Sequence, residues 1–410
     1  MTDLLPVSEA QSRIRAAFAP VSTTGVPLAD ALGRVLSVEI IAPLDLPPFT
    51  NSSMDGFAVR AADVAGASPS APVTLALVAE IPAGAAPSAV IGPQQAARIM
   101  TGALLPAGAD AVVPQEVTRS APGVSAQVEI LEPVRPGDYL RQQGSDLQAG
   151  VPVLRVGHTL TAQDLGLLAA LGIHQVQVFR RPRIALLSSG DELTQPGQPL
   201  SPGKIYDSNT FMLAALVRES GAELLSLGVA ADDPRQVRNL LQSAVDQGVD
   251  LILTSAGVSV GAFDYVRAVL EEQGRLAFWR VDMRPGKPLA FGAYAGIPVI
   301  GLPGNPVSAY VGFLIFARLA IHRLAGLPDQ SLRHFTAVLD DALESDGRES
   351  YLRGTVHLVS GVYHARQAKN QSSANIFALV HANALLIVPS GVKSLPVGAE
   401  VKFMHIGTEG

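Results

Sequence analysis

The sequence contains no cysteine, only one tryptophan and few aromatic residues. The absence of cysteine excludes disulfide bonds and any zinc or iron–sulfur centre held by protein thiolates. The eight histidines do not occur in an H-E-x-x-H or other paired-ligand spacing, so a catalytic transition metal bound by side chains is not expected. No G-x-S-x-G elbow is present, which argues against Ser/His/Asp hydrolase chemistry. The lone Trp279 is predicted to be a core residue.

The excess of one sign of charge over the other is also small. The formal net charge is −6 and there is no long basic block, which argues against general nucleic-acid binding. The first residues, MTDLLPVSEAQ, lack the features of a signal peptide, and no apolar run approaches the ~18 residues of a membrane span. We therefore expect a soluble, cytoplasmic protein with neither a membrane nor a nucleic acid as partner.

The chain is long enough for several domains, at 410 residues of which 48% are hydrophobic. Residues 6–19 have the pattern of an amphipathic helix, with Ser8 as a candidate N-cap. Prolines at 43, 47 and 48 then mark a boundary. Short alternating segments between Pro/Gly turns predict a β-rich domain over 44–140. The segment 141–179 contains a helix capped by Thr161 and then the strand HQVQVF.

Residues 183–325 alternate between apolar strands and amphipathic helices. This order predicts a parallel, doubly wound α/β sheet, and ligands of such sheets bind at the carboxyl ends of the strands. The last helix of this region, PVSAYVGFLIFARLAIHRLAG, is expected to be long and buried. From about residue 330 to 405 the strands are short and the helix content is low, which predicts a small β-barrel.

Four loops in the α/β region are unusual: SSGDEL, SAGVSVGAFDY, MRPGKP and LPGNPVSA. We expect them to face one crevice at the ends of the strands. Gly/Ser loops between a strand and a helix commonly bind anions through backbone N–H groups. SAGVSVG is not a Walker A sequence, however, because Asp264 rather than Gly-Lys opens the helix.

Several acids follow these strands, and a hard cation such as Mg²⁺ prefers their oxygen atoms. For Glu192 and Asp264, which lie in glycine loops, a functional role is favoured. Asp207 is expected to be a helix cap, with Ser208 or Asn209 as further cap candidates for the helix that follows. For Asp233 the sequence leaves the two interpretations open.

Basic residues in FWRVDMRPGKP indicate an oxyanion site, because guanidinium groups form bidentate bonds with phosphate-like groups and lysine supplies a point charge. These residues are Arg280, Arg284 and Lys287, and Ser308 of LPGNPVS is a further hydroxyl donor. In PPFTNSSMDGFAVR, the Asp55-Gly56 pair is most simply the corner of a turn. The residues alone therefore predict a multidomain α/β protein with a crevice for an anionic, phosphorylated ligand.

Eight segments together resemble one family. They are PPFTNSSMDGFAVR, RIMTGALLPAGADAVVPQE, RQQGSDLQAG, SSGDEL, GKIYDSN, SAGVSVGAFDYV, FWRVDMRPGKPLAFG and GLPGNPVSA. The chain resembles the molybdopterin molybdenumtransferases and the E domain of gephyrin over essentially its whole length. The resemblance implies four domains: a discontinuous domain of 1–43 and 141–179, an inserted β-rich domain of 44–140, a nucleotide-binding-type α/β domain of 180–327, and a C-terminal β-barrel of 328–410.

The activity implied is insertion of molybdate into adenylylated molybdopterin, with Mg²⁺-dependent cleavage of the phosphoanhydride and release of AMP. The family is also expected to form a homodimer that shares its site between subunits. Carried over by motif, the catalytic residues are Asp55, Thr101, Glu192, Asp233 and Asp264, of which the last three are the expected Mg²⁺ ligands. The residues implied to bind substrate or molybdate are Arg141, Asp146, Gly257, Ser259, Gly261, Arg280, Arg284, Lys287, Pro288, Ser308, Arg353, Ser372 and Ser373.

Alternatives remain open at this stage. A molybdopterin adenylyltransferase would resemble only residues 180–325 and would consume ATP. A non-catalytic carrier or scaffold for the cofactor would bind the same ligand without turnover. Tungstate in place of molybdate is not distinguished, and an upstream adenylyltransferase and a downstream molybdoenzyme are conceivable partners. Arg280 and Arg284 stand where bacterial relatives often have lysine, which keeps the charge but enlarges the group.

Overall fold

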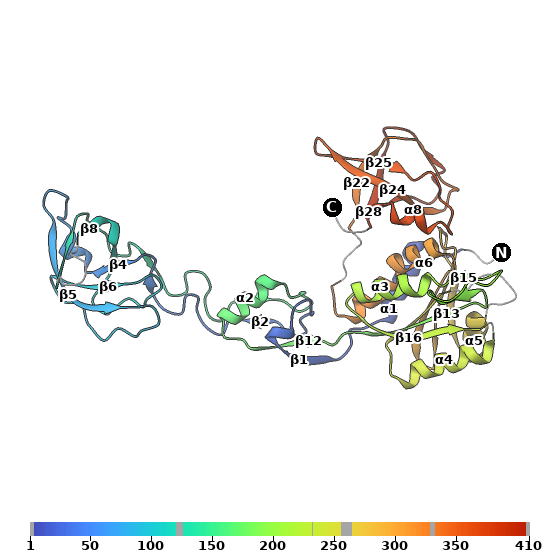
Figure 1. Ribbon diagram of the computed structural model, residues 1–410, viewed down its shortest axis with the longest axis horizontal. Helices are drawn as coiled ribbons and strands as arrows, with labels where there is room; N and C mark the ends of the chain where they lie inside the picture. Colours follow the sequence, from blue (N-terminus) through green and yellow to red (C-terminus); the bar gives the residue numbers. More distant parts are fainter. Residues whose placement is uncertain (1–3, 120–125, 232, 256–264, 329–332, 407–410) are drawn as a thin grey trace. The chain divides into compact units, whose positions relative to one another are not determined.

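The structure is a computed structural model that describes residues 4–119, 126–231, 233–255, 265–328 and 333–406. Its contacts divide the chain into two compact units (Figure 1). The first unit comprises Met1–Val38, Val156–Leu165 and Gln175–Gly410. The second comprises Glu39–Arg155 and Gly166–His174. The four-domain division predicted from the sequence remains a proposal.

A six-stranded sheet forms the centre of the first unit. Its strand order is β16 (Glu223–Ala230), β13 (Arg183–Ser189), β17 (Leu251–Ser255), β21 (Ile297–Leu302), β20 (Pro288–Tyr294) and β18 (Gly274–Arg280). The first four strands are parallel, whereas β20 pairs antiparallel with both β21 and β18. The prediction of a parallel sheet was therefore wrong for one strand, β20, because the connections on either side of β20 are too short to contain a crossover helix.

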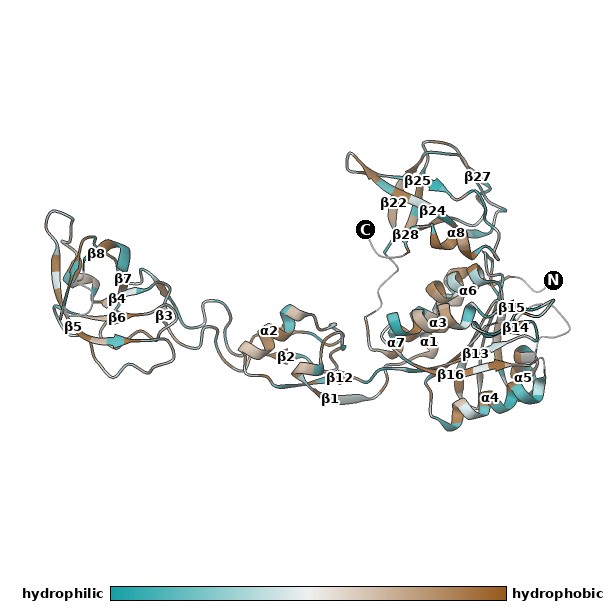
Figure 2. Ribbon diagram, viewed as in Figure 1, coloured by the Kyte–Doolittle hydropathy of each residue, from teal (hydrophilic) through white to brown (hydrophobic). Residues whose placement is uncertain are grey.

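Helices cover both faces of this sheet (Figure 1). On β13, Ile184 and Leu186 belong to a core cluster shared with α1 (Val7–Ala17), α3 (Asn209–Glu219) and α6 (Pro306–Gly312), while Ala185 and Leu187 belong to a second cluster shared with α4 (Pro234–Asp246) and α5 (Tyr265–Gln273). Alternate residues of a strand face opposite sides, so both faces are apolar. In Figure 2, α4 and α5 carry hydrophilic residues and the strands are hydrophobic.

The predicted long helix runs from Pro306 to Leu324 as α6, a π-helical turn η4 (Phe313–Ala317) and α7 (Arg318–Leu324). By length and composition it is the one helix in the described ranges that meets the requirements of a membrane span, with a mean hydropathy of 1.4. The expectation that no run approaches that length was therefore wrong. Since 72% of it is buried inside the structure, it serves as a core helix.

The N-terminal helix was predicted correctly, but its cap was not. Helix α1 begins at Val7 with Pro6 at the N-cap position and no side-chain hydrogen bond there. Thr161 does cap α2 (Ala162–Ala170): its Oγ1 accepts from the Asp164 N–H, and Asp164 Oδ2 accepts from Thr161 in return. This reciprocal pair is a capping box.

A closed barrel forms the C-terminal part of the first unit, as predicted. Strands β24 (Glu349–Val359), β25 (Val362–Gln367), β22 (Phe335–Leu339), β28 (Glu400–His405) and β26 (Ala384–Val388) pair in that order, and β26 pairs again with β24. The short strand β19 (Met283–Arg284) adds to β24 from outside. The barrel encloses its own cluster of buried residues, which includes Leu352, Leu386 and Phe403.

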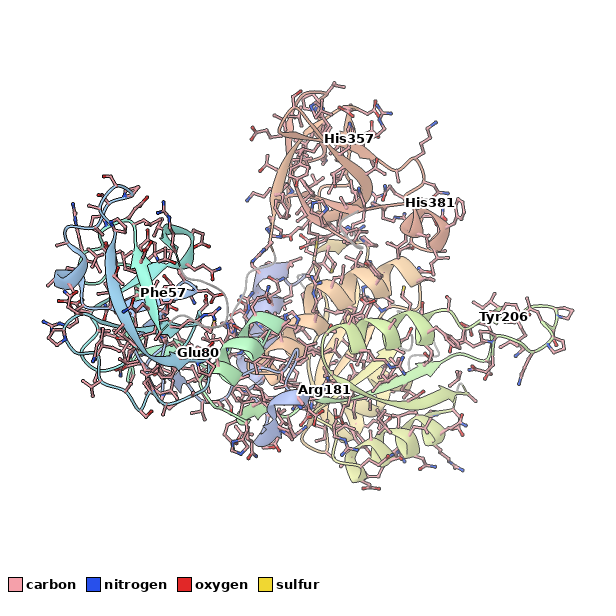
Figure 3. The ribbon with its side chains drawn as sticks, turned by 60° about the vertical axis from the view of Figure 1, so that its left-hand side comes forward. Phe57, Glu80, Arg181, Tyr206, His357 and His381 are labelled. Carbon is pink, nitrogen blue, oxygen red and sulfur yellow. The ribbon has the colours of Figure 1, made fainter. Side chains whose placement is uncertain are left out.

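The second unit is built on another six-stranded sheet, with the order β7 (Ala111–Pro114), β4 (Gly56–Val59), β6 (Gln95–Ile99), β5 (Val73–Ile81), β9 (Gln127–Ile130) and β8 (Thr118–Arg119). Figure 3 labels Phe57 of β4, which is buried in the core, and Glu80 of β5, which is exposed. The β-rich texture expected for this segment is confirmed.

The remaining elements are short. The ribbon β1 (Thr23–Pro27)/β12 (Gln175–Phe179) lies in the first unit. The other pairs are β2 (Ile40–Ile41)/β11 (Pro152–Leu154), β3 (Asn51–Ser52)/β10 (Leu140–Arg141), β14 (Leu193–Thr194)/β15 (Ile205–Tyr206) and β23 (Leu343–Glu344)/β27 (Ser394–Leu395), together with helix α8 (Ile376–Val380). Three 3₁₀ turns cover Leu28–Asp30, Ala61–Val64 and Gln115–Val117.

A cavity of about 180 Å³ lies in the first unit, beside the residues that precede β13 and follow α3. Its lining includes Arg34, Arg180, Arg181, Glu219 and His322; Arg181 is labelled in Figure 3. Because the chain enters β13 and leaves α3 at this point, the cavity is at the amino edge of the sheet, opposite the edge described below. Burial, with Arg318 nearby, lowers the pKa of His322 to about 4, so this imidazole is neutral at physiological pH.

Candidate functional site

The carboxyl edge of the α/β sheet is polar and buried. Strands β13 and β17 run in parallel and end in Ser188, Ser189, Thr254 and Ser255, which are all almost fully buried. Hydroxyl groups at the ends of otherwise apolar strands are costly to bury unless they are hydrogen-bonded. This edge of the sheet therefore differs from the rest of the core in carrying buried hydroxyl groups.

Asn209 connects three elements at this edge. Its Nδ2 donates to Ser255 Oγ at 2.8 Å and to the carbonyl oxygen of Gly304 at 2.8 Å. Beside it, the hydroxyl groups of Ser188 and Thr210 lie 2.7 Å apart. Asn209 was predicted to be one of two helix caps, and that was wrong: it is the first residue of α3, and its side chain holds the end of β17 against the loop before α6.

Asp207 does cap this helix, as predicted, because its Oδ1 accepts from the backbone N–H of Thr210 at 3.0 Å. Its other oxygen is buried, as are Asn209 Oδ1 and Thr254 Oγ1, and these three atoms have no hydrogen-bond partner among the described residues. Buried polar atoms without a partner call for an explanation, and a bound polar ligand is one. The sequence signal was the run DSNT directly after KIY, which we interpreted as capping only.

The predicted acidic residues lie at the same edge where they are described. Glu192 follows β13, and its carboxylate lies so close to Gly190 that a Cβ atom there would be 2.5 Å from Glu192 Oε2. Asp233 follows β16 and caps α4 by accepting from the N–H of Arg235 at 2.9 Å. Four of the predicted residues lie outside the described residues: Gly257, Ser259, Gly261 and Asp264. Within the described ranges, no group of three His, Asp or Glu side chains is arranged to hold a metal.

Trp279 is half-buried at the end of β18 and not in the core, contrary to the prediction. The guanidinium of Arg280 lies over its ring at 3.7 Å from the centroid, and the guanidinium of Arg267 lies over it at 3.9 Å. Arg267 comes from the first turn of α5. Trp279 and Arg280, which we interpreted separately from the sequence, therefore form one stack with Arg267. Arg267 was not predicted, because arginines on helices usually face solvent.

Arg284 and Lys287 belong to the RPGKP turn, which lies between β18 and β20. Arg284 ends β19 and is in register with Ser350 of β24 in the barrel. Lys287 is exposed, and its carbonyl accepts from the N–H of Val281 at 3.0 Å before Pro288 begins β20. A Cβ at Gly286 would lie 3.7 Å from the carbonyl oxygen of Ser308. The RPGKP turn therefore contacts the first turn of α6, where Ser308 is buried.

The QSSAN segment of the barrel reaches the same place. The Val307 N–H donates to the Ser373 carbonyl at 3.0 Å. Arg353, only 1% exposed, donates from Nη1 to the Asn375 carbonyl and from Nη2 to the carbonyls of Asn370 and Ser372, at 2.8–3.1 Å. Burial lowers the pKa of its guanidinium. Arg353 thus holds the segment that carries Ser372 and Ser373.

In the second unit, Asp55 and Thr101 form a close pair. Asp55 Oδ1 accepts from both the N–H and the hydroxyl of Thr101, each at 2.7 Å. These two bonds, backbone first, lower the pKa of Asp55. Arg141 ends β10 in register with Asn51, and the Asp146 N–H donates to the Leu46 carbonyl at 2.9 Å. All four predicted residues of this unit are exposed or half-buried.

Three family models match the chain in succession. Residues 5–172 match the MoeA N-terminal region (domains I and II), residues 185–323 match a probable molybdopterin binding domain, and residues 336–406 match the MoeA C-terminal region (domain IV). Together they cover most of the sequence, in the order expected from its motifs.

Curated relatives are similar over nearly the full length. A molybdopterin molybdenumtransferase of Nostoc is 41% identical over 93% of this chain and 88% of its own length. The molybdopterin molybdenumtransferase 2 of Mycobacterium tuberculosis is 42% identical over 92% of this chain and 93% of its own. Two solved structures of the molybdopterin biosynthesis MoeA protein from Pyrococcus horikoshii are 31% and 29% identical, cover 98% of this chain and 99–100% of theirs, and superpose with TM-scores of 0.85 and 0.81.

Proposed function

The chain belongs to the molybdopterin molybdenumtransferase family, transferases of molybdenum cofactor biosynthesis, and on that premise we propose that it inserts molybdate into adenylylated molybdopterin and releases AMP. The proposal rests on the match of the MoeA N-terminal and C-terminal family models, which lie on both sides of the molybdopterin-binding region in the sequence. An adenylyltransferase would need only that region. The matched regions also contain Asp55, Thr101 and Arg353.

The carboxyl edge of the sheet is the proposed site of the nucleotide-bearing substrate. Two of its buried polar atoms, Asp207 Oδ2 and Asn209 Oδ1, have no partner among the described residues and are suited to hydrogen-bond a polar pterin or phosphate group. The proposed molybdate site is formed by the RPGKP turn, Ser308 and the QSSAN segment. Molybdate is an oxyanion, and cations with fixed hydroxyl and N–H donors stabilise such groups.

Magnesium fits the oxygen donors at this edge only in part. Glu192 and Asp233 follow neighbouring strands of the sheet, and the buried Asp207 Oδ2 lacks a partner among the described residues. The proposed set of Glu192, Asp233 and Asp264 depends on Asp264, which lies outside those residues. A bound Mg²⁺ would supply neutralisation of negative charge on the phosphoanhydride.

Further features are proposed from the family alone. The first is a homodimer in which each subunit contributes to the site of the other through Asp55, Thr101, Arg141 and Asp146. The second is a cytoplasmic location. The third is exchange of substrate with an adenylyltransferase and of product with molybdoenzymes. Tungstate is an alternative cargo, because its tetrahedral oxyanion presents the same charge and shape to the RPGKP turn.

The test uses purified protein, adenylylated molybdopterin and Mg²⁺, with ATP absent. AMP release that depends on molybdate supports the transferase, whereas tight substrate binding without AMP release in either condition supports the carrier or scaffold. Asp264→Asn is expected to keep the fold, measured by thermal unfolding, and to lose Mg²⁺-dependent AMP release. Unchanged turnover in that variant contradicts the proposed role of Asp264.

A further inference from the structure

The stack of Arg267, Trp279 and Arg280 lies at the functional edge of the sheet. Strand β18 is antiparallel to β20, which is antiparallel to β21, and β21 is parallel to β17. Strands β18 and β17 therefore run in the same direction. It follows that Trp279 and Arg280, at the end of β18, share the edge where Ser255 ends β17.

The pairing of β18 with β20 is irregular at the stack. Consecutive residues of a regular strand point to opposite faces, so neighbouring side chains do not stack. The register shifts between Phe278 and Arg280, where the single residue Trp279 lies opposite two residues of β20, Leu289 and Ala290. Such irregularities occur often beside active sites. Beside this one, the guanidinium of Arg280 lies over the indole ring, at 3.7 Å from its centroid.

The two guanidinium groups differ in their partners. Arg267 is paired with Glu271 on the next turn of α5, with two of its nitrogen atoms 2.8 Å from Glu271 Oε1. Arg280 has no carboxylate partner among the described residues, and its buried Nε has no hydrogen-bond partner there. The Arg280 guanidinium therefore has an N–H donor available to an anion.

Arg280 differs from Arg284 in what it contacts. Arg284 is in register with a barrel strand, whereas the guanidinium of Arg280 contacts Trp279, whose other guanidinium comes from α5. Lys287 lies beside Arg280 across the β18–β20 pair, because Arg280 is in register with Pro288 and the Val281 N–H donates to the Lys287 carbonyl. The Trp279 stack therefore adjoins the RPGKP turn.

We propose that Arg267, Trp279 and Arg280 form a clamp for the phosphate of the nucleotide part of the substrate, next to the RPGKP turn. The clamp rests on the proposed function for the identity of its ligand. The indole holds both guanidinium groups by cation–π contact and limits their rotamers. Because both faces of the ring are occupied, the nucleobase does not stack on Trp279, and the ligand is recognised through its phosphate oxygen atoms.

Trp279 is the single tryptophan of the chain, so tryptophan emission reports this site alone. We expect AMP to change the emission of the wild-type protein saturably. Arg280→Gln should raise the Kd for AMP about tenfold, since it removes a charged donor, and Arg267→Gln should raise it less because Glu271 shares that cation. Arg280→Lys retains the charge and should bind AMP between the wild type and Arg280→Gln. Arg275→Gln, on the exposed amino end of the same strand, is the matched control and should leave the Kd unchanged.

Turnover separates this clamp from a purely structural stack. In the AMP-release reaction, Arg280→Gln should raise the KM for adenylylated molybdopterin more than it lowers kcat, and its melting temperature should stay close to that of Arg275→Gln. A KM equal to that of the wild type overturns the clamp. So does an AMP affinity in Arg280→Gln equal to that of the wild type.

The probes distinguish failure of the clamp from failure of the proposed function. Adenosine binding as tightly as AMP, or an emission change with molybdate and none with AMP, overturns the phosphate clamp. An emission that responds to none of these ligands, together with molybdate-dependent AMP release, removes the clamp and keeps the transferase. A saturable emission response to AMP that weakens in Arg280→Gln supports the clamp, even when the reaction releases no AMP. Absence of AMP release counts against the transferase and not against the clamp.

Discussion

The backbone N–H of Val307 donates to the carbonyl oxygen of Ser373 at 3.0 Å. This bond joins the first turn of α6, in the α/β part of the first unit, to the QSSAN segment of the barrel. It places the turn of α6 that carries Ser308 next to the segment that carries Ser372 and Ser373. The oxyanion site that we propose depends on how firmly the barrel holds that segment.

Replacement of Arg353 by methionine is expected to destabilise the protein by about 3 kcal/mol, because three carbonyl groups lose the donor that this buried guanidinium supplies. Urea denaturation measures the free energy of unfolding. Arg366→Met is the matched control in the same barrel, since Arg366 is 62% exposed and its ion pairs lie at the surface; it should cost less than about 1 kcal/mol. Equal losses of unfolding free energy in the two variants would contradict the structural role of Arg353.

Asn209→Leu should lower the free energy of unfolding by about 1–3 kcal/mol, because the Ser255 hydroxyl and the Gly304 carbonyl lose a shared donor in a buried site. AMP release should also fall, as the loop before α6 loses its contact with β17. Gln242→Leu, which removes one exposed hydrogen bond to Asp246 on α4, is the control. Full activity in Asn209→Leu would show that this connection does not support the site.

Thr101→Val should raise the pKa of Asp55 toward its ordinary value while leaving it somewhat lowered, because the hydroxyl donor is lost and the backbone N–H donor remains. Since folding lowers this pKa, the pair contributes stability at neutral pH that is lost as the pH falls through the folded pKa. An NMR titration of the Asp55 carboxyl carbon measures the change. An unaltered pKa would mean that the hydroxyl bond does not form in solution.

His322→Asn should make the protein less sensitive to acid. The folded pKa of about 4 lies below the unfolded value near 6.5, so the unfolded state binds the proton first and wild-type stability falls between about pH 6.5 and pH 4, by roughly 1–3 kcal/mol. Above that window the imidazole is neutral in both states and contributes no pH dependence. Urea denaturation of both proteins at pH 7 and pH 4.5 checks this; parallel losses of stability would rule out His322 as the cause.

Much of the fold could be predicted from hydrophobic periodicity. The apolar run RIALLSS predicted β13, and the structure has it at Arg183–Ser189. Strand direction could not be predicted in the same way, because a buried antiparallel strand such as β20 is as uniformly apolar as a parallel one. The barrel followed from the alternation in its short strands, and its closure is set by the pairing of β26 with β24.

The site was predicted at the level of motifs, and the differences arise where tertiary contacts redirect a side chain. Asn209 has the sequence context of a cap, but the ends of β17 and the loop before α6 give its amide better partners. Trp279 has the character of a core residue, but it lies at the end of β18, where the guanidinium groups of Arg267 and Arg280 cover its ring. In Arg353 the sequence shows a cation, and only the fold shows that its donors are used by three carbonyl groups.

The most direct test of the account is AMP release from adenylylated molybdopterin by the purified protein in the presence of Mg²⁺, with and without molybdate and with ATP absent. We expect AMP release that requires molybdate and that falls in Asn209→Leu and Arg280→Gln. Release that needs ATP, or tight binding of the substrate with no AMP in either condition, would contradict the assignment of molybdate insertion to this chain.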